Sequence, residues 1–184
     1  VGAELSYREN MPLVSGAGVL AAAALPVSGE TGGARGNTVH GVLNLLSVIT
    51  NTPLFDSAAW LVEFTWSRWD KVTQGETLFL GRPGYTALDA VSKNATQVAL
   101  GFTPTWFQVF PGVDMTLPIN YSVGLDGNAA TAFGGNKNAG TYSVGIGLDI
   151  RQQYKIDLKY VDFFGPTTVV GGVATVTPGN SSLK

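Results

Sequence analysis

Residues 141–151 have the sequence TYSVGIGLDIR, and this stretch decides the fold because its residues alternate strictly in character. One side of an extended chain would carry the apolar set Tyr142, Val144, Ile146, Leu148 and Ile150. The other side would carry the small or polar set Thr141, Ser143, Gly145, Gly147, Asp149 and Arg151. Successive side chains of a β-strand point to opposite faces, so this period of two predicts a strand with one fully apolar face.

The same alternation continues on both sides of this stretch. It is clear in residues 113–124 and 154–160, and weaker in residues 58–70 and 96–105. Residues 3–9 are a short strand candidate, whereas residues 37–50 fit either a strand or a helix. We therefore expect an all-β chain of about seven antiparallel strands in up-and-down order, most of them about ten residues long.

Two architectures compete for such strands: a soluble β-protein with its apolar face inside, and a transmembrane β-barrel with its apolar face in lipid. Strands of about 9–11 residues match a bilayer, whereas strands of soluble proteins centre on about five or six. Long and short connections also alternate, as in membrane barrels. The long loops are expected at residues 10–36, 71–94, 125–140 and 165–184. These features favour a single transmembrane barrel segment that comprises residues 1–184.

Composition excludes several other classes of protein. The chain has 13 acidic and 11 basic residues, so its formal net charge of −2 gives no basic surface for nucleic acid. Cysteine is absent and His40 is the one histidine, which leaves no disulfide, no thiolate metal site and no multi-histidine metal site. A triad of His40 with Ser47 and an aspartate lacks any nucleophile motif. We expect no enzymatic activity, no cofactor and no bound metal.

The strand count and the chain ends predict an incomplete barrel. Single-chain bacterial barrels have an even number of strands and at least about eight. The weakly polar run at residues 13–25 is shorter than a membrane-spanning helix of about 20 residues, and residues 176–184 have loop chemistry. We expect a portion of a larger barrel, closed by other parts of the same chain or by further copies of it.

Two sets of side chains are candidates for functional roles in such a barrel. An aromatic girdle at the membrane interfaces would contain Trp60, Trp66, Trp69, Trp106, Phe107, Tyr154, Phe163 and Phe164. The lumen-facing charged residues would be Glu63, Asp114, Asp149, Arg151, Lys155, Asp157 and Lys159. The alternatives are that the aromatic residues pack in an ordinary core and that the charges form cross-strand ion pairs which only stabilise the wall.

Several strings, in order along nearly the whole chain, carry a resemblance to a known family. They are AELSYRENMPL at residues 3–13, HGVLNLL at 40–46, PLFDSAAW at 53–60, WSRWDKV at 66–72, FTPTWFQVFPGVD at 102–114 and LKYVDFFG at 158–165. The chain resembles the carboxy-terminal part of a large proteobacterial family of unknown function that is predicted to reside in the outer membrane. Members are longer and end in one more strand with a terminal aromatic residue. No catalytic residues are established for that family.

The resemblance implies a setting in the envelope of a Gram-negative bacterium, near an exporter of the resistance-nodulation-division type and in the metabolism of apolar or aromatic compounds. The leading hypothesis is therefore an outer-membrane barrel that gives small hydrophobic or aromatic solutes a porin-like passage or a binding surface. Its partners would be outer-membrane lipid and envelope export machinery. The alternative is a structural or adhesive envelope protein that assembles through exposed sheet edges.

Overall fold

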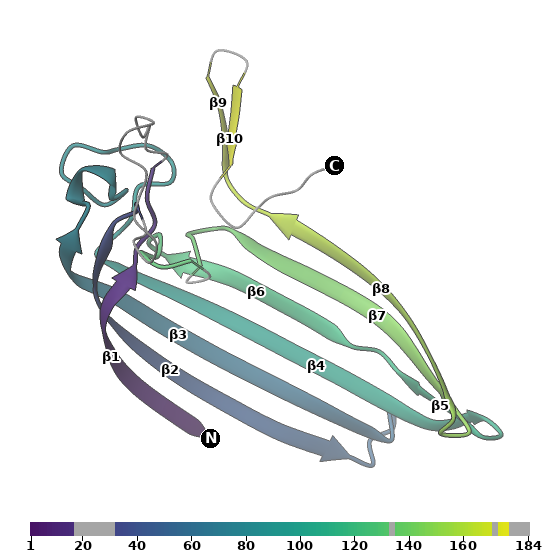
Figure 1. Ribbon diagram of the computed structural model, residues 1–184. Coiled ribbons are helices and arrows are strands. Elements are labelled where there is room, and N and C mark those ends of the chain that lie inside the picture. Colours follow the sequence, from purple (N-terminus) through teal and green to yellow (C-terminus); the bar gives the residue numbers. More distant parts are fainter. Residues whose placement is uncertain (17–31, 133–134, 171–172, 177–184) are drawn as a thin grey trace.

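The computed structural model describes residues 1–16, 32–132, 135–170 and 173–176, and these form one large antiparallel sheet and one small hairpin (Figure 1). The large sheet contains β1 (Gly2–Pro12), β2 (Arg35–Thr50), β3 (Ser57–Gln74), β4 (Asn94–Phe110), β5 (Val113–Thr116), β6 (Ile119–Asp126), β7 (Gly140–Ile150) and β8 (Tyr154–Phe164). The hairpin contains β9 (Thr167–Val170) and β10 (Val173–Val176). A short 3-10 turn, η2 (Glu76–Leu78), lies between β3 and β4, and no described helix is long or apolar enough to cross a membrane.

Consecutive strands pair with one another across the sheet, and β5 and β6 together fill one position between β4 and β7. Pro118 separates these two strands because it has no N–H to donate to the ladder. The register nevertheless continues through the break, since Leu117 N donates to Pro104 O at 3.0 Å and Gly145 N donates to Pro118 O at 2.9 Å. The sheet thus has eight strands in seven positions. The expected count of about seven is corrected because the one strand expected over residues 113–124 is divided into β5 and β6.

The structure also corrects the expected boundaries. Residues 37–50 lie in strand β2, so the helical alternative is wrong. The loop expected at residues 165–184 contains the β9–β10 hairpin, and its residues 171–172 and 177–184 lie outside the described residues. The other long connections are shorter than expected because β1, β3 and β6 run further into them, and residues 17–31 of the first connection and 133–134 of the third are outside the description.

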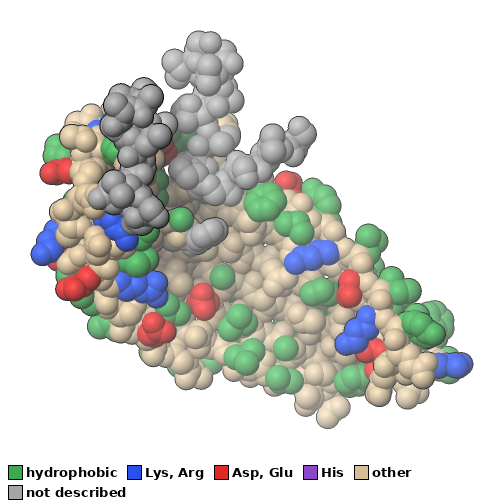
Figure 2. Space-filling model, viewed as in Figure 1, with side chains coloured by type: hydrophobic (Ala, Val, Ile, Leu, Met, Phe, Trp, Pro, Cys, Tyr) green, Lys and Arg blue, Asp and Glu red, His purple; other side chains and the backbone are tan. Residues whose placement is uncertain are grey.

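The two faces of the sheet differ in chemistry as the alternation predicts. On β7, Val144 and Ile146 are 41% and 47% exposed, whereas Ser143 on the opposite face is 7% exposed. The face that carries Ser143 is hollowed and consists mainly of small and polar side chains (Figure 2). We call it the concave face and the apolar one the convex face. Most of the exposed large apolar side chains therefore lie on the outside of the curve, without a second layer of described residues over them.

The buried core lies in the loops at one end of the sheet and not on a sheet face. Leu13, Ala34, Phe79 and Ala130 form it, from three different connections between strands. Backbone hydrogen bonds tie the connections together, with Val14 N donating to Ala130 O at 2.8 Å. We call this packed group of loops the loop cluster. It gathers at the end of the sheet opposite the short β2–β3, β4–β5 and β7–β8 turns (Figure 1).

Glycine at position 140 is required by the close approach of neighbouring strands. A Cβ atom at Gly140 would overlap Ser122 O and the ring of Phe164, whereas one at Gly101 would meet Asn120 Oδ1 at 3.4 Å, an ordinary contact. We expect Gly140→Ala to lower the free energy of unfolding by about 1–3 kcal/mol through overpacking, and Gly101→Ala to leave it nearly unchanged. Urea titration of both variants measures this difference. Equal stabilities would contradict the close packing of β6, β7 and β8.

Candidate functional site: the concave face

The concave face is built from small polar side chains along its central strands. Asn120 Nδ2 donates to Ser143 Oγ at 3.3 Å, and the hydroxyl groups of Ser122 and Thr141 lie 3.0 Å apart. Each pair joins β6 to β7 at directly opposed positions. Because these side chains are short and bonded to each other, they leave the hollow above them open and polar.

Glu63 lies in the middle of this face, in the row that also contains Asn44 on β2 and Ala99 on β4. Two apolar residues lie next to it. Leu46 and Leu61 are direct cross-strand partners on the same face and are 65% and 40% exposed. The β2–β3 part of the concave face therefore combines a carboxylate with an exposed apolar pair.

Most of the other predicted lumen charges gather on the concave face near the short turns. Asp114, Asp149 and Lys155 are cross-strand partners in one row, with Lys155 Nζ 3.7 Å from Asp149 Oδ2. Asp157 and Lys159 follow on the same face of β8. The Asp114 carboxylate also accepts a hydrogen bond from the backbone of β4, at Gln108 N. This arrangement places the expected cross-strand ion pair at the turn end.

Arg151 differs from the other predicted lumen charges. It lies in the β7–β8 turn with a left-handed backbone, φ 54°, and its N–H donates to Gly112 O at 2.7 Å. It belongs to the contact between two adjacent turns and not to the wall of the hollow. The prediction from simple alternation extended one residue beyond the end of the strand.

The predicted girdle residues divide between the two faces. Trp60, Trp66, Trp106, Tyr154 and Phe164 share the convex face with the apolar residues, and Phe107 is exposed near the β4–β5 turn. Trp69 and Phe163 instead occupy concave-face positions, opposite Thr38 and Thr141. Trp69 packs edge-on against Phe79 of the loop cluster, with ring centroids 5.2 Å apart. It is a packing residue at the loop end.

The convex face carries a continuous band without charged residues. The band consists of every second residue, the one whose side chain is on the convex face, in the ranges 43–49, 58–66, 98–106, 113–123, 142–150 and 154–160. Arg68, Asp126 and Asp162 bound it at the loop end. Tyr142 Oη and Tyr160 Oη both donate to Asp162 Oδ2, at 3.2 and 3.3 Å. Tyrosines with apolar rings and bonded hydroxyl groups therefore mark one border of this band.

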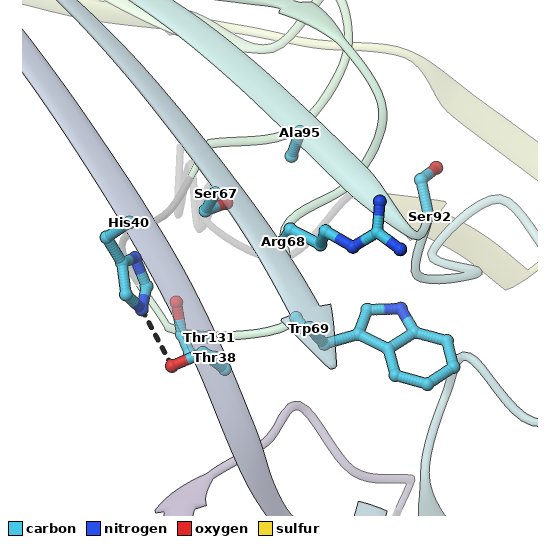
Figure 3. A pocket seen from close by; sticks show the side chains of 9 residues that line it. Thr38, His40, Ser67, Arg68, Trp69, Ser92, Ala95 and Thr131 are labelled. Carbon is cyan, nitrogen blue, oxygen red and sulfur yellow. Dashed lines mark hydrogen bonds between the residues drawn. The ribbon is translucent and has the colours of Figure 1, made fainter. Parts of the chain in front are cut away.

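A small pocket lies where the loop cluster meets the concave face. Thr38, His40, Ser67 and Ala95 line it from β2, β3 and β4, and the β6–β7 loop covers it (Figure 3). His40 Nε2 lies 2.8 Å from Thr38 Oγ1. The pocket does not have room for a water molecule, so it is a packed contact between loop and wall and not a ligand cavity.

Next to this pocket, Lys93 covers the ring of Trp69. Its Nζ lies 3.6 Å from the ring centroid and donates to Asp70 O at 2.7 Å. Burial, followed by the nearby positive charge of Arg68, lowers the pKa of the Lys93 ammonium group. The cation–π contact attaches the end of the β3–β4 connection to the loop cluster.

The nominal triad of His40, Ser47 and an aspartate can be checked against the sheet. His40 is on the concave face and Ser47 is on the convex face, so the nominal triad cannot assemble. Within the described ranges, no group of three or more histidine and acidic side chains comes together to hold a metal ion. The concave face is a polar wall with an apolar strip and a covered end.

Residues 1–174 match the family described as a protein of unknown function, DUF1302. The chain belongs to the DUF1302 family. No curated protein and no solved structure matches the sequence at a significant level.

In this DUF1302 chain, sequence reasoning missed the residues that form the covered end. Phe79, Asn128 and Ala130 lie in connections with no periodic pattern, and their contacts join segments far apart in the sequence. A signal did exist for Trp69, because it is three residues after Trp66 and an odd spacing on a strand places two residues on opposite faces. The same rule separates Phe163 from its neighbour Phe164.

Proposed function

We propose that this chain is part of the wall of an outer-membrane β-barrel, with its convex face in lipid and its concave face lining a passage for small hydrophobic or aromatic solutes. The observation that carries the proposal is the uncharged apolar band on the exposed convex face. An exposed apolar surface of this extent is unfavourable in water and favourable in hydrocarbon. Gram-negative outer membranes are the usual setting of such barrels.

Strand length supports the same proposal. Strand β3 has 18 residues, which at about 3.3 Å per residue corresponds to about 60 Å. A tilted strand crosses the hydrocarbon core with about 9–11 residues. Strands β2, β3 and β4 are therefore long enough to cross and to project well beyond the bilayer at the loop end, where the loop cluster packs on them.

The nature of the solute is proposed from the concave face. Leu46 and Leu61 offer an apolar strip inside an otherwise polar hollow, and a small aromatic solute could lie on it while ions and water occupy the polar side. Closure of the barrel is proposed to come from further strands of the same chain or from other copies, since the described parts of β1 and β8 each pair on one side only. Export machinery of the envelope would then be the partner that uses the passage.

Reconstitution of the full chain into planar lipid bilayers tests the proposal. We expect discrete current steps, and a fall in current when toluene is added as a small aromatic probe. Leu61→Ser should weaken the toluene block and retain the current, because it removes half of the apolar strip and leaves the wall intact. Absence of current steps from the folded protein would refute the passage, and current insensitive to toluene would refute the apolar solute.

A second candidate function is favoured by the edges of the sheet. Strands β1 and β8 are each 11 residues long, and unpaired edges of that length promote association with other strands. The chain would then be a structural or adhesive envelope protein. Fibres seen by electron microscopy, together with an absence of membrane current, would favour this candidate over the first.

A further inference from the structure

We propose that residues 128–131 of the β6–β7 loop are a fixed constriction at the loop end of the passage and set the size of solute that enters. This inference rests on the proposed passage and adds the element that determines its selectivity. Residues 128–131 fold back over the concave face, where Ala130 and Thr131 line a pocket together with wall residues of β4, β3 and β2.

Burial on the concave face locates the constriction. Thr38 and Ala95 are 1% and 3% exposed where the loop covers them, and Ala130 of the loop is itself 6% exposed. Ala130 and Thr131 line the same pocket as the wall residues His40 and Ser67 (Figure 3). Further along the same face, Leu46 and Leu61 are exposed. Among the described residues, the concave face is therefore covered over β2, β3 and β4 at the loop end and uncovered at Leu46 and Leu61.

Asn128 is the residue that holds this segment in place. Its Nδ2 donates to Leu88 O at 3.0 Å and to Ala90 O at 2.9 Å, and its Oδ1 accepts a hydrogen bond from Lys137 N at 3.2 Å. Its backbone N–H donates to Ser92 Oγ at 3.1 Å, and its carbonyl accepts from Ser92 N at 2.9 Å. The Asn128 side chain thus joins the β6–β7 loop to the β3–β4 connection and also bonds within its own loop.

On its other side the segment is bonded to the connection between β1 and β2. Val14 N donates to Ala130 O at 2.8 Å, and Leu80 N in turn donates to Val14 O at 3.2 Å. The segment is therefore held from both sides, as a constriction needs to be if it is to have a constant width.

Single-channel recording of the full chain in lipid bilayers, combined with limited proteolysis, tests this inference. Asn128→Ala removes the side-chain hydrogen bonds of Asn128, so we expect proteolysis within the β6–β7 loop to accelerate about tenfold. We expect the single-channel conductance to rise about twofold in parallel, and larger solutes to enter. Ala130→Arg should have the same effects, because a buried alanine position cannot accommodate arginine. Heat-modifiable gel migration checks that both variants still fold.

Asp126→Asn is the matched control in the same loop region. It breaks the ion pair of Asp126 with Lys137, whose side chains are largely exposed, so conductance and proteolysis should match the wild type. Wild-type conductance in both Asn128→Ala and Ala130→Arg would overturn the inference and leave the passage itself standing. An equal rise in Asp126→Asn would also overturn it, since general softening of the loop would then be the cause. Absence of current in the wild type would refute the passage instead.

Discussion

Leu100→Arg is expected to lower the free energy of unfolding in lipid vesicles by about 2–4 kcal/mol, the cost of a lipid-facing arginine near the bilayer midplane. Leu100 lies on the convex face in the row that contains Val62 and Tyr121, near the middle of the uncharged band. Urea titration of the protein folded into vesicles, followed by tryptophan fluorescence, measures the change.

The adjacent residue provides the control for this substitution. Ala99 lies on the concave face directly opposite Glu63, so Ala99→Arg places the same charge next to a carboxylate in the polar hollow. We expect a cost below about 1 kcal/mol, since cross-strand pairs of opposite charge are mildly favourable. A similar loss of stability in both variants would indicate that the two faces do not differ in environment. A larger loss in Ala99→Arg would reverse the assignment of the faces.

Phe79→Ala is expected to release the loop cluster, because removal of a buried phenylalanine side chain costs about 3–5 kcal/mol. Phe79 is 1% exposed and packs on Trp69 and Leu13. Hydrogen exchange should accelerate at the amides of Gly16 and Leu80, which bond across the cluster, and remain slow in β7 and β8.

Phe79→Leu is the conservative comparison for this release. It retains most of the apolar volume, so its effect on exchange should be much smaller. Exchange of Gly16 and Leu80 at the wild-type rate in Phe79→Ala would contradict a core centred on the loops. Faster exchange throughout the sheet would instead indicate that the loop cluster and the sheet unfold together.

The two faces of the sheet could be predicted from sequence because strand geometry is local. On β7 and β8 the period of two alone assigns every side chain to a face, and the structure places Val144 and Ser143 as the pattern predicts. The break at Pro118 was not predicted. Alternation continues through it, and the lost N–H changes the hydrogen bonding without changing the side-chain pattern.

The loop cluster could not be predicted from sequence for a physical reason. Its stability comes from contacts between residues far apart in the chain, such as Asn128 with Leu88 and Val14 with Ala130. Irregular connections have no repeating geometry, so their composition indicates only that they are loops. The same holds for the β9–β10 hairpin, where a loop was expected.

The central proposal is that the convex face of the sheet contacts hydrocarbon. Fluorescence quenching along β8 tests it most directly. The chain has no cysteine, so single cysteines at Ile156, Asp157, Leu158 and Lys159 can each carry a polarity-sensitive fluorophore. With the full chain folded into vesicles, we predict quenching by nitroxide-labelled lipid at residues 156 and 158, and by aqueous iodide at residues 157 and 159. Iodide quenching at all four positions, or the opposite alternation, would contradict the account.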